Sequence, residues 1–124
     1  MKINDAATLA EVTAAFARYE AALTSNDVAV LDELFLAEPT TLRYGIEAIR
    51  AFRSSRAPTG LARRLDRTQI TTYGSDCAVA ATLFHRDSAP ARVGRQMQTW
   101  IRTPAGWRVA AAHVSIIDQP RDPA

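Results

Sequence analysis

The sequence predicts an α+β domain whose helices come first and whose antiparallel strands follow. In the first part of the chain, apolar residues recur at spacings of three and four, the period of an amphipathic helix. In the second part, clusters of Gly, Pro, Ser and Asp divide the chain into runs of strand length. The 124 residues fit one domain, and a 48% hydrophobic share is enough for a packed core. We expect that domain to span residues 1–118, followed by a loose tail over 119–124.

Two helices are predicted before residue 39. The first would bury a single stripe made of Leu9, Val12, Phe16, Tyr19 and Leu23. Asn26-Asp27 breaks this pattern and is suited to cap a second, shorter helix, which Pro39 ends. The buried face of the second helix would hold Val30, Leu31, Leu34 and Phe35.

A short strand and a third helix are predicted next. The run from Thr40 to Tyr44 is typical of a strand, and Gly45 stops it. The helical spacing continues with Ile46, Ile49 and Phe52, and Pro58 and Gly60 close the segment. After residue 60, turn signals at residues 74–76, 87–90 and 103–106 separate four strands, which end near Tyr73, Arg86, Arg102 and Asp118.

The last hairpin is specific enough to predict its register. If residues 103–106 form the loop, Arg102 faces Trp107, Gln98 faces Ala111, and Gln96 faces His113. Because side chains alternate along a strand, one face would hold Gln96, Gln98, Trp100, Val109, Ala111, His113 and Ser115. The other would hold Met97, Thr99, Ile101, Ala110, Ala112, Val114 and Ile116. Both faces are too apolar for plain exposure, so one should face the helices and a cavity and the other a second subunit, which predicts a homodimer through the sheet.

Charge and composition argue against several classes of partner. The net charge is only +2, and the arginines between Arg50 and Arg67 lack the exposed aromatics that nucleic-acid surfaces interleave with basic residues. We interpret those arginines as a mostly solvated face, with one or two available for a small anion. No apolar run approaches the ~20 residues that span a bilayer. No signal peptide is visible, so a cytoplasmic protein without a membrane partner is expected.

The sequence contains no recognisable motif for binding a metal or a cofactor. The two histidines and the single cysteine lie far apart, without metal-ligand spacing. Phosphate loops, nucleotide fingerprints and nucleophile elbows are also missing, so we expect neither metal nor cofactor. Cys77 stands in an apolar run, which favours a buried, inert thiol.

Several motifs carry a resemblance to a known family. They are Leu42-Arg43-Tyr44-Gly45, Ala48-Ile49-Arg50-Ala51-Phe52-Arg53, Gly94-Arg95-Gln96, Thr99-Trp100-Ile101-Arg102, Gly106-Trp107-Arg108 and Ala112-His113-Val114-Ser115. With three helices against a curved antiparallel sheet, the chain resembles the cone-shaped nuclear-transport-factor-like (SnoaL-like) superfamily. Within it the motifs look like the AtzH-like family, which includes the HpxZ-type proteins of oxalurate catabolism. The resemblance runs from about Phe16 to Ile116.

The resemblance implies hydrolysis or deamination of small acidic ureido compounds such as dicarboxyurea. It also implies a pocket that uses a tyrosine of the first helix and the arginine of the Arg-Tyr-Gly motif, which are Tyr19 and Arg43 here. The chain departs from the family pattern in the loop after Gly45, which is shortened to Ile46-Glu47 and should lie near the cone mouth. Leu36 and Met97 replace an aromatic and a small polar residue.

Tyr19 and Arg43 are the candidate catalytic residues. A phenol with a pKa near ~10 is a poor base, but an adjacent guanidinium favours the phenolate and lowers that pKa. Arg43 would clamp a substrate carboxylate through two parallel hydrogen bonds. The structural alternatives are a core ring for Tyr19 and a salt bridge from Arg43 to Glu20 or Glu47.

Gln96, Gln98 and His113 are the candidate substrate-binding residues. The two glutamines offer amide donors and acceptors on one predicted strand face, and the small Ala111 opposite Gln98 leaves space there. His113, which the predicted register places opposite Gln96, could relay a proton or simply be a satisfied structural histidine.

The sequence therefore favours a small, cofactor-free amidohydrolase that acts on a carboxylated amide or ureide. Its expected partners are a small anionic substrate and a second copy of the chain. One alternative is a non-catalytic anion-binding or accessory subunit, since this fold carries many functions. A second alternative is an engineered scaffold with a new activity in a hydrophobic pocket, suggested by Leu36, Met97 and the shortened loop.

Overall fold

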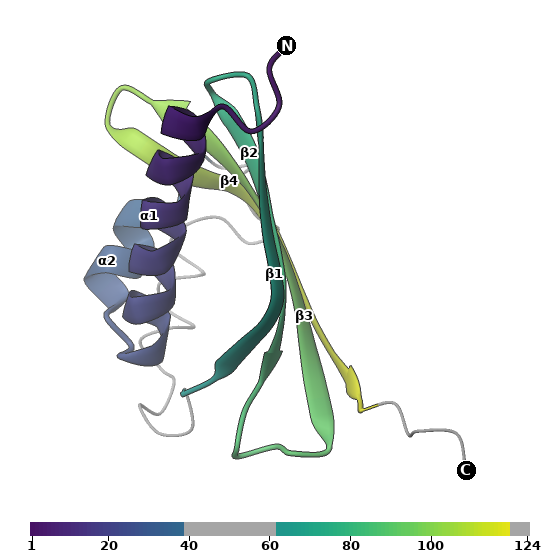
Figure 1. The fold of residues 1–124 in the computed structure, drawn as a ribbon. Helices are drawn as coiled ribbons and strands as arrows, with labels where there is room; N and C mark the ends of the chain where they lie inside the picture. Colours follow the sequence, from purple (N-terminus) through teal and green to yellow (C-terminus); the bar gives the residue numbers. More distant parts are fainter. Residues whose placement is uncertain (39–61, 120–124) are drawn as a thin grey trace.

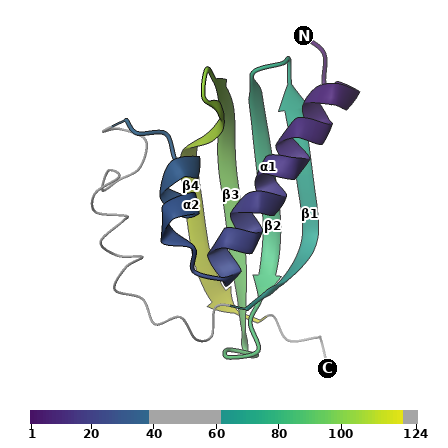
Figure 2. The same ribbon diagram turned by 90° about the vertical axis from the view of Figure 1, so that its left-hand side faces the viewer.

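The fold is one layer of helices packed against one antiparallel sheet. The computed structural model describes residues 1–38 and 62–119. The elements are α1 (Ala6–Thr24), α2 (Val28–Leu34), β1 (Arg64–Tyr73), β2 (Cys77–His85), β3 (Arg92–Thr103) and β4 (Gly106–Asp118). Both helices lie on the same face of the sheet, which we call the inner face, and no described helix covers the opposite, outer face (Figures 1 and 2). The predicted strand at residues 40–44, the predicted third helix and Arg43 lie outside the described residues.

Local sequence explains both helices. The carboxylate of Asp5 caps α1 by accepting hydrogen bonds from the Thr8 backbone N–H at 3.1 Å and from the Thr8 hydroxyl at 3.0 Å. Asp27 caps α2 in the same way, through the Val30 backbone N–H at 3.3 Å. The predicted apolar stripes are buried at Val12, Phe16, Tyr19, Leu23, Leu31, Leu34 and Phe35, whereas Leu9 and Val30 are half-buried.

The four strands form a simple meander in the order β1-β2-β3-β4, with every neighbouring pair antiparallel. All three predicted turn regions connect consecutive strands. The end of α2 is tied to the sheet because Phe35 forms a bridge with Val109, and the Leu36 N–H donates to the Val109 carbonyl at 2.9 Å. The inner face of β2, β3 and β4 thus supplies Ala78, Ala80, Trp100 and Val109 to one core with the helices.

The register of the last hairpin corrects the prediction. Arg102 faces Trp107 as predicted, and Trp100 faces Val109. The next pair is Thr99 with Ala111, so Ala110 is an extra residue in β4 and forms a β-bulge. Beyond a bulge every side chain changes face, because strand side chains alternate with a period of two. Gln98 therefore faces Ala112 and Gln96 faces Val114, not Ala111 and His113.

Two further observations concern the outer face and the helices. Cys77 is half-buried, and its neighbour Ala78 faces the core, so its thiol lies on the outer face and not inside the core as predicted. Within the described ranges, neither helix has the length and apolar character needed to cross a membrane.

Candidate functional site

The candidate site begins as a row of buried side chains on β3. Trp100, Gln98 and Gln96 alternate with outward residues, so all three point to the inner face, and their exposed fractions are 0%, 1% and 4%. Two buried glutamines next to each other on one strand face are unusual, since Gln is mostly found on protein surfaces. A buried amide requires hydrogen-bond partners or a ligand that supplies them.

Tyr19 reaches this row from α1. Its ring is 5% exposed and packs edge-on against Trp100, with ring centroids 6.3 Å apart and an interplanar angle of 89°. On its other side it contacts Phe35, with ring centroids at 6.2 Å. The structure thus brings the predicted Tyr19 next to the strand that carries Gln96 and Gln98.

Each glutamine has one satisfied and one unsatisfied end. The Gln98 Oε1 accepts a hydrogen bond from the Trp100 Nε1–H at 3.1 Å, and the Gln96 Oε1 accepts one from the Arg63 Nη2–H at 3.1 Å. The Nε2 groups of both residues are buried, and neither has a hydrogen-bond partner among residues 1–38 and 62–119. The inner face therefore holds two buried, unpaired amide donors.

Arg63 lies at the Gln96 end of this row, also on the inner face. Its side chain is only 2% exposed and makes a two-pronged ion pair with Glu20, from Nε to Oε1 at 2.6 Å and from Nη2 to Oε2 at 2.8 Å. The guanidinium also lies over the Phe84 ring, 4.4 Å from its centroid. Glu20 follows Tyr19 directly in α1, so the same helix supplies both the phenol and the carboxylate.

Sequence reasoning missed Arg63. The sequence predicts a mostly solvated cluster of arginines, with one or two available for a small anion, and does not single out Arg63. Arg64 and Arg67 of that cluster are exposed. Glu20 was considered only as a partner for Arg43, which lies outside the described residues. Nothing in the local pattern distinguishes Arg63 from Arg64, because the carboxylate that holds it lies 43 residues away in the chain.

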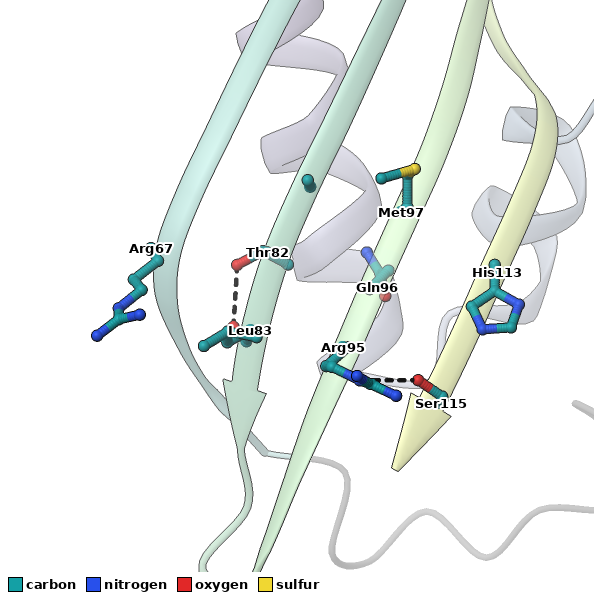
Figure 3. A pocket seen from close by; sticks show the side chains of 9 residues that line it. Arg67, Thr82, Leu83, Arg95, Gln96, Met97, His113 and Ser115 are labelled. Carbon is teal, nitrogen blue, oxygen red and sulfur yellow. Dashed lines mark hydrogen bonds between the residues drawn. The ribbon is translucent and has the colours of Figure 1, made fainter. Parts of the chain in front are cut away.

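His113 is not part of the inner face, which corrects its predicted role beside Gln96. The bulge at Ala110 turns His113 to the outer face, where it pairs with Met97. There it lines an open groove of about 630 Å³ together with Arg67, Arg95, Met97 and Ser115 (Figure 3). Figure 3 also shows that the Gln96 side chain points away from this group, toward α1.

The arrangement favours ligand binding by hydrogen-bond donors. Of the residues that the structure describes, no three His, Cys, Asp or Glu side chains come together as potential metal ligands. What the inner face offers is two buried amide N–H groups, a phenol and a neutralised arginine, which suit a ligand with several acceptor oxygens.

Comparisons with known proteins agree with this architecture. A crystal structure of a protein of unknown function from Pectobacterium atrosepticum has a TM-score of 0.90 and 56% identity, over 94% of this chain and 95% of that chain. A cystatin-like fold protein from Burkholderia xenovorans has a TM-score of 0.90 and 43% identity, over 97% and 99%. An NTF2-like protein from Novosphingobium aromaticivorans shares the fold at 24% identity and a TM-score of 0.66, over 94% and 93%.

No curated protein is significantly similar to the chain. The AtzH-like family model matches residues 1–120, which is nearly the whole sequence. The fold is thus the NTF2-like, cystatin-like fold, and the chain belongs to the AtzH-like family.

Proposed function

We propose that the protein hydrolyses a small carboxylated amide or ureide, of the dicarboxyurea or oxalurate type, without a cofactor. The observation that carries this proposal is the pair of buried, unpaired Nε2 donors of Gln96 and Gln98. Leaving a buried polar group unpaired costs about 1–3 kcal/mol, so two of them side by side are best explained by a ligand. Residues two apart on a strand are separated by ~7 Å, which suits two oxygens of one small molecule.

The proposed chemistry assigns one role to each group. The amides of Gln96 and Gln98 hold carbonyl or carboxylate oxygens of the substrate. By its place in the family motif, Arg43 binds a substrate carboxylate. A water molecule adds to the carbonyl carbon while Tyr19 takes its proton or stabilises the developing charge. The C–N bond then breaks, and the leaving nitrogen takes up a proton.

A second function competes with this one. The position of His113 on the outer face leaves the described inner face without an imidazole. The one buried arginine of that face is already neutralised by Glu20. Such a site can hold a small anion without reacting with it, which favours an anion-binding or accessory subunit as the alternative.

Turnover separates the two functions. The purified protein is incubated with oxalurate and with dicarboxyurea-like compounds. Release of urea and oxalate from oxalurate, and of ammonia and carbon dioxide from the dicarboxyurea-like compounds, is followed. The Tyr19→Phe variant keeps the ring contacts with Trp100 and Phe35 and loses only the hydroxyl. We expect it to lose turnover by about 10²–10⁴-fold, the usual contribution of general acid–base catalysis, with a much smaller change in substrate affinity.

Tyr73 provides the matched control, because it is an exposed tyrosine on β1. Tyr73→Phe should leave turnover unchanged. If Tyr19→Phe keeps near-full turnover and loses only ~0.5–1.5 kcal/mol of unfolding free energy, its hydroxyl is a structural hydrogen-bonding group and the catalytic assignment is wrong. If the parent hydrolyses none of these compounds but binds them, the binding function replaces the hydrolase.

A further inference from the structure

The buried Arg63 has little freedom to act as a direct ligand for the substrate. Three of its N–H bonds are already assigned, two to Glu20 and one to Gln96, and Phe84 covers one face of its guanidinium. Its charge is matched by Glu20 at 2.6 Å. A move toward a ligand would break this ion pair in a buried place, which is strongly unfavourable.

What Arg63 controls is the orientation of the Gln96 amide. A guanidinium can only donate hydrogen bonds, so the amide end that faces it must be the oxygen. The opposite end, the Nε2 group, is thereby turned away from Arg63 and remains unpaired among the described residues. Trp100 acts on Gln98 in the same way, because an indole N–H also only donates.

We propose that Arg63, held by Glu20, is a positioning residue that locks Gln96 as a hydrogen-bond donor. This end of the site is then selective for acceptor oxygens, which both ends of a carboxylate group supply and only one end of an amide group supplies. A carboxylate only accepts hydrogen bonds and therefore matches a fixed N–H donor. A group that presents N–H at the same point meets another donor and is rejected. This inference rests on the site of the proposed function and adds the residue that sets its ligand preference.

The first test exchanges the donor for an acceptor. In Gln96→Glu, one carboxylate oxygen can keep the contact with Arg63, while the other replaces the Nε2 donor. We expect the affinity for malonate, measured by calorimetric titration, to fall at least tenfold, the size of one hydrogen bond to a charged group. The urea midpoint should fall as well, because Glu20 already neutralises Arg63 and the new carboxylate is an excess buried charge. The titration is therefore made under conditions in which circular dichroism shows that the variant is folded. Gln69→Glu adds the same charge at an exposed position of β1 and should change neither quantity.

The second test removes the Arg63–Gln96 hydrogen bond without changing the net charge. Arg63→Met alone leaves the half-buried Glu20 without its ion-pair partner and is expected to destabilise the fold. The double variant Arg63→Met with Glu20→Gln removes one positive and one negative charge together and should recover stability. In this double variant the Gln96 side-chain amide is free to rotate, so that its oxygen and its NH₂ group can exchange places. We expect the preference for malonate over the neutral malonamide to drop about tenfold relative to the parent. A purely structural ion pair predicts an unchanged preference.

A spectroscopic signature completes the test. Malonate should shift the side-chain NH₂ resonances of Gln96 and Gln98 in the ¹⁵N–¹H spectrum of the parent protein. Absence of these shifts at millimolar malonate, or full malonate affinity in Gln96→Glu, overturns the inference. Failure of the hydrolase proposal looks different. The parent would then hydrolyse none of the ureides, while the malonate shifts and the effects of the variants remain.

Discussion

Beside Gln96, three residues contact one another in turn: Gly94, Phe84 and Arg63. Gly94 on β3 pairs with Phe84 on β2, and the Phe84 ring lies directly over the glycine. The Arg63 guanidinium lies over the same ring, 4.4 Å from its centroid. A side chain at position 94 would occupy the place of the ring. The missing side chain of Gly94 therefore sets the height of Phe84 and, through it, the position of the guanidinium.

Gly94→Ala should consequently destabilise the protein by about 1–3 kcal/mol, the usual cost of overpacking a well-filled position. The measurement is urea unfolding followed by circular dichroism. Adding Phe84→Leu should restore part of the loss, since a smaller side chain makes room for the new methyl group. An unchanged urea midpoint in Gly94→Ala would show that Phe84 moves aside freely and does not position Arg63.

Contacts between elements show how α1 is oriented across the sheet. Arg102 near the end of β3 donates two hydrogen bonds to Glu11 of α1, at 2.9 Å and 2.8 Å. It also donates to the Ser75 carbonyl in the β1–β2 turn at 2.9 Å. One arginine thus joins α1 to β3 and to the β1–β2 turn. It lies near the end of β3, whereas Arg63 precedes the start of β1, which the pairing places at the opposite end of the sheet.

This ion pair gives stability a defined pH dependence. Hydrogen bonds from Arg102 lower the pKa of Glu11 below its ordinary value of 4.5. A lowered pKa in the folded state means that the pair stabilises the fold above about pH 4.5 and that this contribution disappears as the pH falls through the lower, folded-state pKa. Glu11→Gln should therefore reduce the melting temperature at pH 7, and the difference from the parent should shrink as the pH falls below the ordinary pKa of 4.5 and through the lowered, folded-state pKa.

The exposed Asp87, just after β2, supplies the control for loss of one carboxylate. Asp87→Asn should not show the same pH-dependent difference. A melting temperature of Glu11→Gln that equals the parent's at pH 7 would contradict the expectation, because it would mean that solvent screens the pair completely.

For the whole molecule, the outer face of the sheet is the main surface to explain, because neither described helix covers it. Four of the five outward residues of β2 are apolar, namely Cys77, Val79, Ala81 and Leu83, and the fifth is His85 at the strand end. This strand is thus mostly apolar on both faces, a pattern typical of strands covered on both sides. Met97 on β3 projects from the same face and is 55% exposed. At ordinary strand spacing and rise, the face of four strands measures roughly 600 Å², close to the ~800 Å² that each partner commonly contributes to a stable interface.

A second copy of the chain remains our proposed partner for this face. Light scattering at micromolar concentration should give about twice the 13.5 kDa chain mass. Met97→Glu places a charge in the middle of the outer face and should shift the protein toward monomer. Ala14→Glu adds the same charge on the exposed side of α1 and should leave the mass unchanged. A parent protein that is monomeric at this concentration would contradict the proposal of a homodimer.

Local pattern determined much of this protein. The apolar stripes and the capping residue Asp27 are short-range signals, and α2 begins directly after the predicted cap. Asp5, which caps α1, is a signal of the same kind, although it was not among the predicted capping residues. The turn clusters likewise gave the order of the four strands, and the motifs gave the family. Gln96 and Gln98 were predicted on the face that carries Trp100, because the alternation of one strand needs no knowledge of its neighbour.

Tertiary structure alone decided the placement of His113 and Arg63. The bulge at Ala110 arises from pairing between β3 and β4, and no residue in the run Val109-Ala110-Ala111-Ala112 marks it, so the face of His113 could not be read from the sequence. Arg63 is buried because Glu20, Phe84 and Gln96 meet around it from distant parts of the chain. Charge burial depends on such long-range partners, whereas sequence periodicity reports only which side of an element is apolar.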